Sequence, residues 1–255
     1  KTVTELIEIL VDPETAHRLT LGLLRLAGSL PPSRWALQAL FSAPEKPVQA
    51  FGLKFKNPLG LAAGYDKDGV ALRGLATLGF GHIEIGTVTP APQPGNPKPR
   101  LFRLVEDEAV INRMGFPGTG MSKVASQMSP VIHRPPPVIL GVNLGKNKDT
   151  PLEEAPNDYI SLMKVFSTRA DYLAINISSP NTIGLRRLQG RDMLETLLGA
   201  IAKARQEITL ECGTHTPILV KLAPDLSDDE LNEAIDIILQ NGMDGVIVTN
   251  TTLER

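Results

Sequence analysis

The residues best suited to chemistry form a short polar segment in the second half of the chain. Residues 176–182 read Asn-Ile-Ser-Ser-Pro-Asn-Thr and directly follow residues 170–175, an apolar run that predicts a buried strand. Amides and hydroxyls donate and accept hydrogen bonds without adding fixed charge. Pro180 ends a strand because it has no backbone N–H. The segment is therefore poor core material that can supply hydrogen bonds to a ligand, although alone it is also typical of a turn that caps a helix.

The same pattern recurs along the chain, and this favours the chemical interpretation. Short apolar runs at residues 59–62, 83–88, 138–142, 172–175, 218–222 and 245–248 predict six strands. Each run contains or precedes small or polar residues at its carboxyl end. These residues are Gly64, Asp66, Lys67, Thr87, Asn143, Lys146, Asn176, Lys221, Thr249, Asn250 and Thr251.

The strands alternate with helical patterns, notably at residues 191–207 and 227–241, and the latter begins with a capping box formed by Ser227 and Glu230. Continuous apolar strands separated by helices predict an α/β fold with a parallel sheet. Two architectures remain, an open doubly wound sheet and a closed (β/α)8 TIM barrel. An open sheet uses mainly the strand ends near its switch point, whereas a barrel brings all ends into one ring. Six polar strand ends favour the barrel.

Residues 1–42 form a separate N-terminal helical extension to the barrel, which we place at residues 43–255. Helical spacing predicts helices at residues 3–10 and 13–27, and Pro31-Pro32-Ser33 is expected to interrupt the helical pattern before it resumes at residues 35–41. The extension has little polar surface. It is either a cap packed on the barrel or an apolar platform that contacts a membrane or admits an apolar ligand.

Composition excludes several classes of protein. The chain has 255 residues, a formal net charge of −2, and 42% hydrophobic residues, as expected for an ordinary globular protein. The near-neutral charge gives no electrostatic case for binding nucleic acid. Cys212 is the single cysteine, and no cluster of histidines or cysteines suggests a metal site. No apolar run reaches the length of a membrane span.

Taken together, these motifs resemble those of the class 2 dihydroorotate dehydrogenases, the quinone-linked flavoenzymes of pyrimidine synthesis. The other class of this family normally has cysteine where Ser179 stands and lacks an N-terminal extension. The motifs that carry the resemblance lie at residues 57–64, 66–67, 86–90, 95–97, 100–103, 111–116, 141–148, 176–182, 221–226 and 249–252.

The resemblance implies a (β/α)8 barrel with FMN at its strand ends, where dihydroorotate is oxidised to orotate before electrons pass to a membrane quinone. It implies that Ser179 takes the place of the catalytic base. The implied FMN-binding residues are Ala63, Gly64, Lys67, Thr87, Asn143, Asn176, Lys221 and Thr249. The implied substrate-binding residues are Lys67, Asn112, Arg113, Met114, Gly115, Phe116, Asn176, Asn181, Asn250 and Thr251.

These residue types suit that chemistry. The four asparagines of the substrate set can pair with a ring of amide donors and acceptors without adding charge. Lys67 can balance the substrate carboxylate. Lys221 can stabilise negative charge that grows on the flavin. A serine is a weak base, so Ser179 requires a hydrogen-bond or water relay to remove its proton.

The resemblance also places His17 and Arg103 on a tunnel between the N-terminal helices and the barrel, where the quinone head enters. It implies a monomer that binds the membrane surface through these helices. The expected location is the cytoplasmic face of the bacterial inner membrane, with the mitochondrial inner membrane as the alternative. A surface histidine on a helix is the commoner situation, so this role rests on the resemblance.

One departure from the family pattern leaves alternatives open. Six strand–helix units are present where a closed barrel has eight, and the glycine-rich segments that hold the flavin phosphate in the family are expected beyond Arg255. We therefore expect the native polypeptide to continue. The alternatives are a non-catalytic remnant that acts as an interaction partner, and an enzyme of this fold that hands electrons to fumarate or NAD.

Overall fold

A curved parallel sheet forms the centre of the computed structural model, which describes residues 11–132 and 138–254. Its strand order is β10-β9-β8-β7-β4-β3, which follows the order of the chain without reversal. Every neighbouring pair is parallel. This sequential order is that of a barrel and not of a doubly wound sheet, so the predicted barrel architecture is confirmed for these six units. The strands are β3 (Gly60–Leu61), β4 (His82–Val88), β7 (Ile139–Leu144), β8 (Tyr172–Asn176), β9 (Ile218–Leu222) and β10 (Gly245–Val248).

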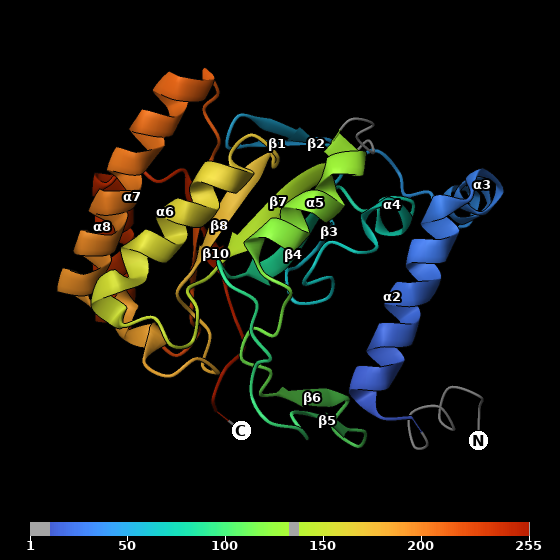
Figure 1. Cartoon of the computed structure of the whole chain (residues 1–255), viewed down its shortest axis with the longest axis horizontal. Helices are drawn as coiled ribbons and strands as arrows, with labels where there is room; N and C mark the ends of the chain where they lie inside the picture. The colour runs from blue at the N-terminus through green and yellow to red at the C-terminus, as the bar shows by residue number, and fades with distance from the viewer. Residues whose placement is uncertain (1–10, 133–137, 255) are drawn as a thin grey trace.

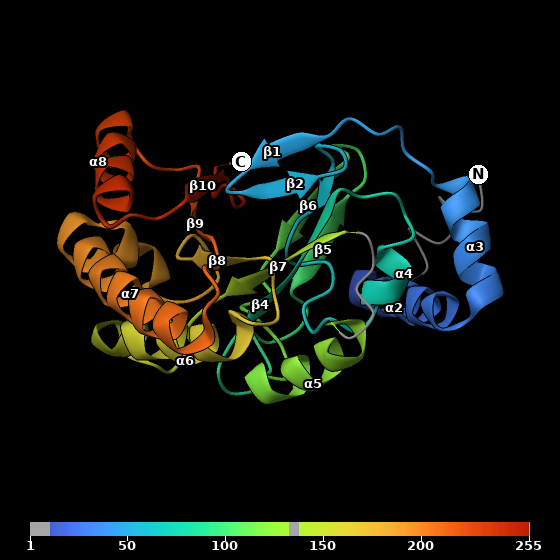
Figure 2. The same ribbon diagram turned by 90° about the horizontal axis from the view of Figure 1, so that it is seen from above.

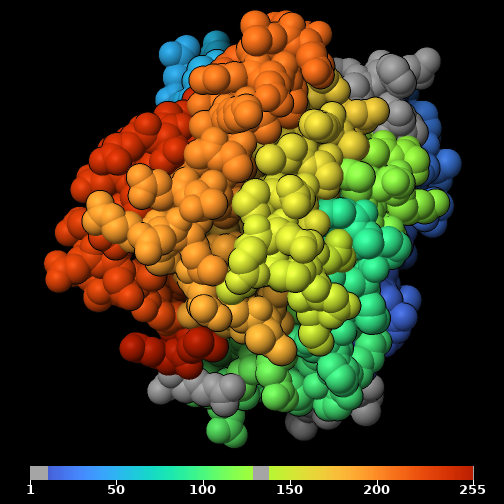
Figure 3. Space-filling model, turned by 60° about the vertical axis from the view of Figure 1, so that its left-hand side comes forward, coloured from blue at the N-terminus to red at the C-terminus, as the bar shows by residue number. Residues whose placement is uncertain are grey.

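Helices cover the outer face of the sheet, as the view in Figure 2 shows. They bury one continuous apolar cluster with the strands, in which Ile83, Val142 and Ile175 are fully enclosed. Figure 3 shows α6, α7 and α8 packed side by side over this face. The helices are α4 (Leu72–Leu75), α5 (Met121–Ile132), α6 (Ala155–Phe166), α7 (Arg191–Cys212) and α8 (Asp228–Gln240), with short 3-10 turns η1 (Leu152–Glu154) and η2 (Leu185–Gln189).

Two antiparallel hairpins lie outside the predicted pattern. The first pairs β1 (Val48–Ala50) with β2 (Leu53–Phe55), and the second pairs β5 (Leu101–Leu104) with β6 (Ala109–Asn112). Their strands are three or four residues long and at most one residue in each is buried, so they lack the long apolar runs that identify the parallel strands. The second hairpin lies beside the first turn of α2, as Figure 1 shows.

The N-terminal extension contains α2 (Pro13–Ser29) and α3 (Pro31–Leu40). The predicted interruption of the helix is confirmed, but it falls at Leu30, and the next helix begins at Pro31 rather than at residue 35. Proline is accepted at the first helical positions, where a backbone N–H has no intrahelical partner, so α3 begins at Pro31. Residues 3–10, predicted as a helix, lie outside the described residues. No described helix is long and apolar enough to cross a membrane.

Two glycines let α2 pack tightly against α4. A Cβ at Gly28 would stand 2.4 Å from the Gly74 nitrogen, and one at Gly74 would stand 2.1 Å from the Leu24 oxygen. The inward residues Leu21 and Leu24 pack against the core. The outward face of α2 is also apolar and carries Leu19, Leu23, Leu26 and Leu30, all more than half exposed. One helix therefore has two apolar faces, of which the barrel covers only one.

Candidate functional site

A pocket opens at the carboxyl ends of the parallel strands, and sequence reasoning singled out every residue that lines it. The strand ends supply its floor, and the segment after β6 supplies one wall. The lining residues are Ala63, Gly64, Lys67, Thr87, Asn112, Met114, Gly115, Phe116, Asn176, Ser179, Asn181, Lys221, Asn250 and Thr251. The fold thus gathers residues nearly 190 positions apart in the chain.

The backbone after β3 is shaped for close approach by a ligand. Gly64 has φ +107°, a conformation that residues with a Cβ rarely adopt, and nothing lies within 4 Å of the position where its Cβ would be. Its amide is fixed by a hydrogen bond to the Gly86 oxygen at 2.9 Å. A flat ring can therefore lie directly against this peptide.

Two lysines supply positive charge to the pocket. Lys67 donates to the Gly64 oxygen, and burial lowers the pKa of its ammonium, with Glu14 acting in the opposite sense. Lys221, the penultimate residue of β9, is only 7% exposed. Among the described residues no carboxylate forms an ion pair with either lysine. A buried cation without a partner is costly, so the pocket is suited to an anionic ligand.

Amides and hydroxyls form a connected network beneath the pocket. Thr87 Oγ1 donates to Asn143 Oδ1 at 2.6 Å, and Asn176 Nδ2 donates to the same oxygen at 2.9 Å. Asn143 is fully buried and reaches the pocket through Thr87 and Asn176. Three neighbouring strands, β4, β7 and β8, position these side chains near their carboxyl ends.

The two serines of residues 176–182 have different surroundings. Ser178 is fully buried, donates to Asn176 Oδ1 at 2.9 Å and accepts from Asn250 Nδ2 at 3.0 Å. Ser179 lines the pocket, and its Oγ accepts from the Asn181 backbone N–H at 3.2 Å. The Ser179 hydroxyl proton has no acceptor among the described residues, so of the two it alone is available to a ligand or water.

The end of β6 and the segment that follows it line one side of the pocket. Asn181 Nδ2 donates to the Asn112 oxygen at 3.1 Å, which joins this segment to the serine loop. Asn112 and Met114 line the pocket, whereas Arg113 between them does not. The Arg113 guanidinium lies 5.1 Å from the centre of the Phe102 ring on β5. Of the predicted flavin- and substrate-binding residues, Arg113, the buried Asn143 and the exposed Thr249 thus lie outside the lining.

The residues predicted for quinone access lie between α2 and the barrel. The His17 ring on α2 stands 5.0 Å from the Tyr65 ring, centre to centre, and Tyr65 Oη donates to Thr20 Oγ1 at 3.0 Å. Arg103 Nη1 on β5 donates to the Val11 oxygen at 2.7 Å. Burial lowers the pKa of His17, and the charge of Lys67 acts in the same direction. His17 thus approaches the loop that carries Gly64 and Lys67 through Tyr65.

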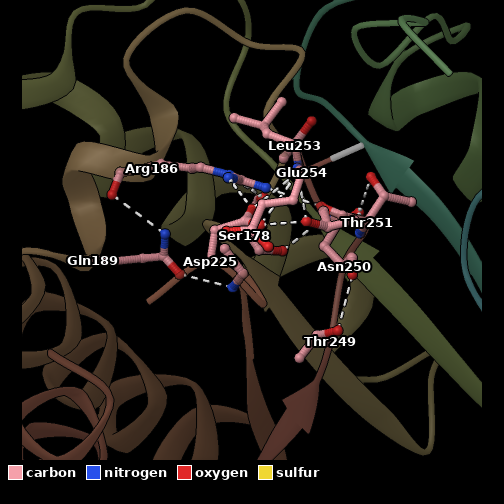
Figure 4. A network of polar contacts seen from close by, with 12 residues as sticks. Ser178, Arg186, Gln189, Asp225, Thr249, Asn250, Thr251, Leu253 and Glu254 are labelled. Atoms are coloured by element: carbon pink, nitrogen blue, oxygen red, sulfur yellow. Dashed lines mark hydrogen bonds and ion pairs between the residues drawn. The ribbon is translucent and has the colours of Figure 1, made fainter. Parts of the chain in front are cut away.

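Sequence reasoning missed several polar residues that hold this region together. Arg186 donates to the Ser178 oxygen, to Asp225 and to the Thr251 oxygen, and so joins the loops after β8, β9 and β10 (Figure 4). Glu84 lies inside an apolar strand, and a lone charge at such a position was a signal available in the sequence. Glu14 pairs with Arg100 at 2.7 Å across the junction of α2 and the barrel.

The Glu14–Arg100 pair predicts a pH-dependent attachment of α2. Hydrogen bonding from Arg100 lowers the pKa of Glu14 from 4.5 to about 2. Because the folded pKa is depressed, the stabilisation is complete above pH 4.5 and is lost as pH falls toward 2. We expect Glu14→Gln to lower the free energy of unfolding by up to about 3 kcal/mol at pH 7. Urea unfolding across this pH range should show the two proteins converging at low pH. Glu211→Gln, at an exposed position of α7, is the control. A difference in stability between Glu14→Gln and the wild type that persists at pH 2 would contradict the role of the Glu14–Arg100 pair.

The strand order and the pocket define a (β/α)-barrel enzyme whose site takes a polar, anionic ligand. The family model for dihydroorotate dehydrogenase matches residues 47–255, and the chain belongs to this family. These flavoenzymes oxidise dihydroorotate to orotate in pyrimidine biosynthesis.

Relatives and solved structures agree with this assignment. The chain is 47% identical over 245 residues to "Dihydroorotate dehydrogenase (quinone)" of Pseudomonas fluorescens (strain Pf0-1). The matched region covers 96% of this chain and 70% of the relative. It is 50% identical over 247 residues to the Citrobacter koseri protein of the same name, which covers 96% of this chain and 71% of the relative. The ferulenol complex of DHODH from Eimeria tenella matches with TM-score 0.85 and 40% identity, over 96% of this chain and 68% of that one.

Proposed function

We propose that the pocket binds FMN and dihydroorotate together and that the electrons leave to a membrane quinone. The observation that carries this proposal is the pair of lysines, Lys67 and Lys221, held in an amide-lined pocket without carboxylate partners among the described residues. An anionic substrate and a flavin that gains negative charge would satisfy both cations.

The proposed FMN-binding residues fit a flavin ring. Gly64 offers an open backbone surface, Thr87 and Asn176 offer polar atoms from the floor, and Lys221 offers its charge. When bound, FMN accepts the hydride that dihydroorotate loses. The role of Lys221 is to stabilise the resulting negative charge, since it is buried and local dielectric screening is weak.

The proposed substrate residues line the same pocket. Asn112, Asn181 and Asn250 supply amides for the ring, and Lys67 binds the carboxylate. Ser179 removes the ring proton as its own hydroxyl proton passes to a water, because its hydroxyl is the one that faces the pocket while that of Ser178 is paired internally.

The outward face of α2 supports a peripheral membrane role, on the cytoplasmic face of a bacterial inner membrane. Leu19, Leu23, Leu26 and Leu30 recur at helical spacing and are more than half exposed. Trp35 and Leu40 on α3 are 69% and 77% exposed, so the apolar surface continues. A helix with such a face lies in the membrane interface, and the quinone would enter between this extension and the barrel.

The membrane role predicts the effect of charges on α2. Replacing both Leu23 and Leu26 with glutamate should reduce binding to liposomes by roughly tenfold or more. Each substitution removes an exposed apolar side chain that the membrane would bury, and adds a charge. Co-sedimentation with vesicles measures this. Leu210→Glu is the control, because Leu210 is also an exposed leucine but lies on α7. Equal loss of binding in the control would contradict a membrane role specific to α2.

The quinone route predicts the effect of a substitution at His17. His17→Ala should raise the apparent KM for quinone several-fold while leaving the rate of flavin reduction by dihydroorotate unchanged, because the ring lies on α2 and outside the substrate pocket. Steady-state assays with a short-chain quinone and stopped-flow reduction separate the two effects. A slower reduction by dihydroorotate would place His17 in the substrate half-reaction instead.

The choice of electron acceptor tests the proposed function as a whole. The purified enzyme, supplied with dihydroorotate, should turn over with ubiquinone or menaquinone analogues and not with fumarate or NAD. Efficient turnover with fumarate or NAD in place of quinones would contradict the proposal that a membrane quinone is the electron acceptor.

A further inference from the structure

Glu84 is a charged side chain within an apolar strand. It lies in β4 between Ile83 and Ile85 and is 4% exposed. Both carboxylate oxygens accept hydrogen bonds: Oε1 from Asn143 Nδ2 at 2.9 Å, and Oε2 from Tyr172 Oη at 2.9 Å. The proposed reaction gives Asn143 a role but gives none to Glu84 or Tyr172.

The carboxylate determines which way the Asn143 amide points. An asparagine amide has a donor end and an acceptor end of similar size, so its shape alone does not choose between two orientations. A carboxylate only accepts, so Asn143 must turn Nδ2 toward Glu84. Its Oδ1 then faces the pocket floor, where it accepts from Thr87 and Asn176.

The orientation passes from one side chain to the next. Asn176 donates Nδ2 to Asn143 and turns its Oδ1 toward Ser178, where it accepts from Ser178 Oγ at 2.9 Å and from the Ser178 backbone N–H at 3.2 Å. Ser178 Oγ in turn accepts from Asn250 Nδ2 at 3.0 Å. The remaining Asn250 oxygen accepts from the Thr251 backbone N–H at 2.8 Å, at the end of the network drawn in Figure 4.

Tyr172 donates the hydrogen bond at the other end of this network, to Glu84. Burial, and next the charge of Glu84, raise the pKa of the Tyr172 phenol, so it remains a protonated donor. The Tyr172 ring is buried and packs edge-on against His82, 6.3 Å away between ring centres. In both hydrogen bonds of Glu84 the carboxylate must therefore be the acceptor, with Asn143 and Tyr172 as the donors.

We propose that Glu84 is a positioning residue whose carboxylate fixes the amide orientations of Asn143, Asn176 and Asn250. The pocket thus presents one fixed pattern of donors and acceptors to the flavin ring and to dihydroorotate before either binds. This preorganisation matters because a site built to match donors with acceptors loses affinity when a buried polar group faces the wrong partner. The ligands in this proposal rest on the proposed function, whereas the direction of the network does not.

Reversing one hydrogen bond tests the proposal. In Asn143→Asp, two carboxylates face each other in a buried site, and both FMN content and the thermal unfolding midpoint should fall. In Glu84→Gln, either end of the glutamine can face Asn143, so the amide orientations become mixed. The Kd for orotate, read from the flavin spectrum, should rise about 5- to 100-fold.

The double variant Glu84→Gln with Asn143→Asp should recover much of the loss. The introduced glutamine then donates to one oxygen of the introduced aspartate and accepts from Tyr172, while the other aspartate oxygen still accepts from Thr87 and Asn176. Its unfolding midpoint should exceed that of Asn143→Asp in the FMN-free and FMN-bound proteins. Tyr172→Phe removes one donor without changing the direction of the network, so it should lower the midpoint yet leave the orotate Kd near the wild-type value.

Additive effects on the midpoint in the double variant, or an unchanged orotate Kd in Glu84→Gln, would overturn the role of Glu84. The midpoint of the FMN-free protein is independent of the ligands. Recovery there, together with a wild-type protein that binds neither FMN nor orotate, would instead refute the proposed function while supporting the network.

Discussion

Ser179→Ala will retain bound FMN and lose the reaction with dihydroorotate. The Ser179 hydroxyl lines the pocket and is 4% exposed, and among the described residues nothing accepts its proton. Removing a group that transfers a proton typically slows a reaction by about 10²–10⁴-fold. FMN content should not change, because the alanine side chain fits and the flavin-facing residues remain.

Stopped-flow reduction of the bound flavin by dihydroorotate measures this effect directly. Ser178→Ala is the matched control: it removes a neighbouring hydroxyl that is paired with Asn176 and Asn250, so it should act mainly on substrate affinity and much less on the limiting rate. Reduction at the wild-type rate in Ser179→Ala would remove Ser179 from the chemistry, and a larger rate loss in Ser178→Ala would exchange the two roles.

Lys221→Met will make the protein more stable and less able to react. The ammonium is buried in β9 without a carboxylate partner in the described part of the chain, and methionine has a similar shape without the charge. Removing an unpaired buried charge should raise the unfolding midpoint of the FMN-free protein. Removing a group that stabilises growing negative charge should slow flavin reduction by about 10²–10³-fold.

Thermal unfolding and stopped-flow reduction together separate this role from a structural one. Lys203→Met, on the exposed face of α7, should change neither quantity. A fall in the unfolding midpoint of Lys221→Met would indicate that the ammonium has a stabilising partner within the protein. An unchanged reduction rate would show that its charge does not act on the flavin.

The parallel strands and most of the pocket could be predicted because they leave a local signal. A short apolar run followed by glycine, asparagine or lysine marks both a buried strand and its functional end. Residues far apart, such as Gly64 and Asn250, then meet because parallel strands share one edge of the sheet. The two hairpins gave no such signal, since their strands are short and lack long apolar runs.

Side-chain direction was harder to predict than position. The resemblance placed Arg113 with Asn112 and Met114 in the substrate site, but the Arg113 side chain lies against Phe102 and outside the pocket lining. The Glu84–Asn143 bond joins residues on neighbouring strands whose separation in sequence gives no indication of contact. The Glu14–Arg100 pair likewise depends on how α2 packs on the barrel.

An anaerobic absorption spectrum of the purified protein, recorded before and after adding dihydroorotate, is the decisive measurement for the proposed chemistry. We predict flavin bands that bleach with dihydroorotate and return on adding a quinone, because the substrate must reduce the cofactor in this pocket. Flavin bands that stay unchanged when dihydroorotate is added, or a protein that binds no FMN even when FMN is supplied, would contradict it.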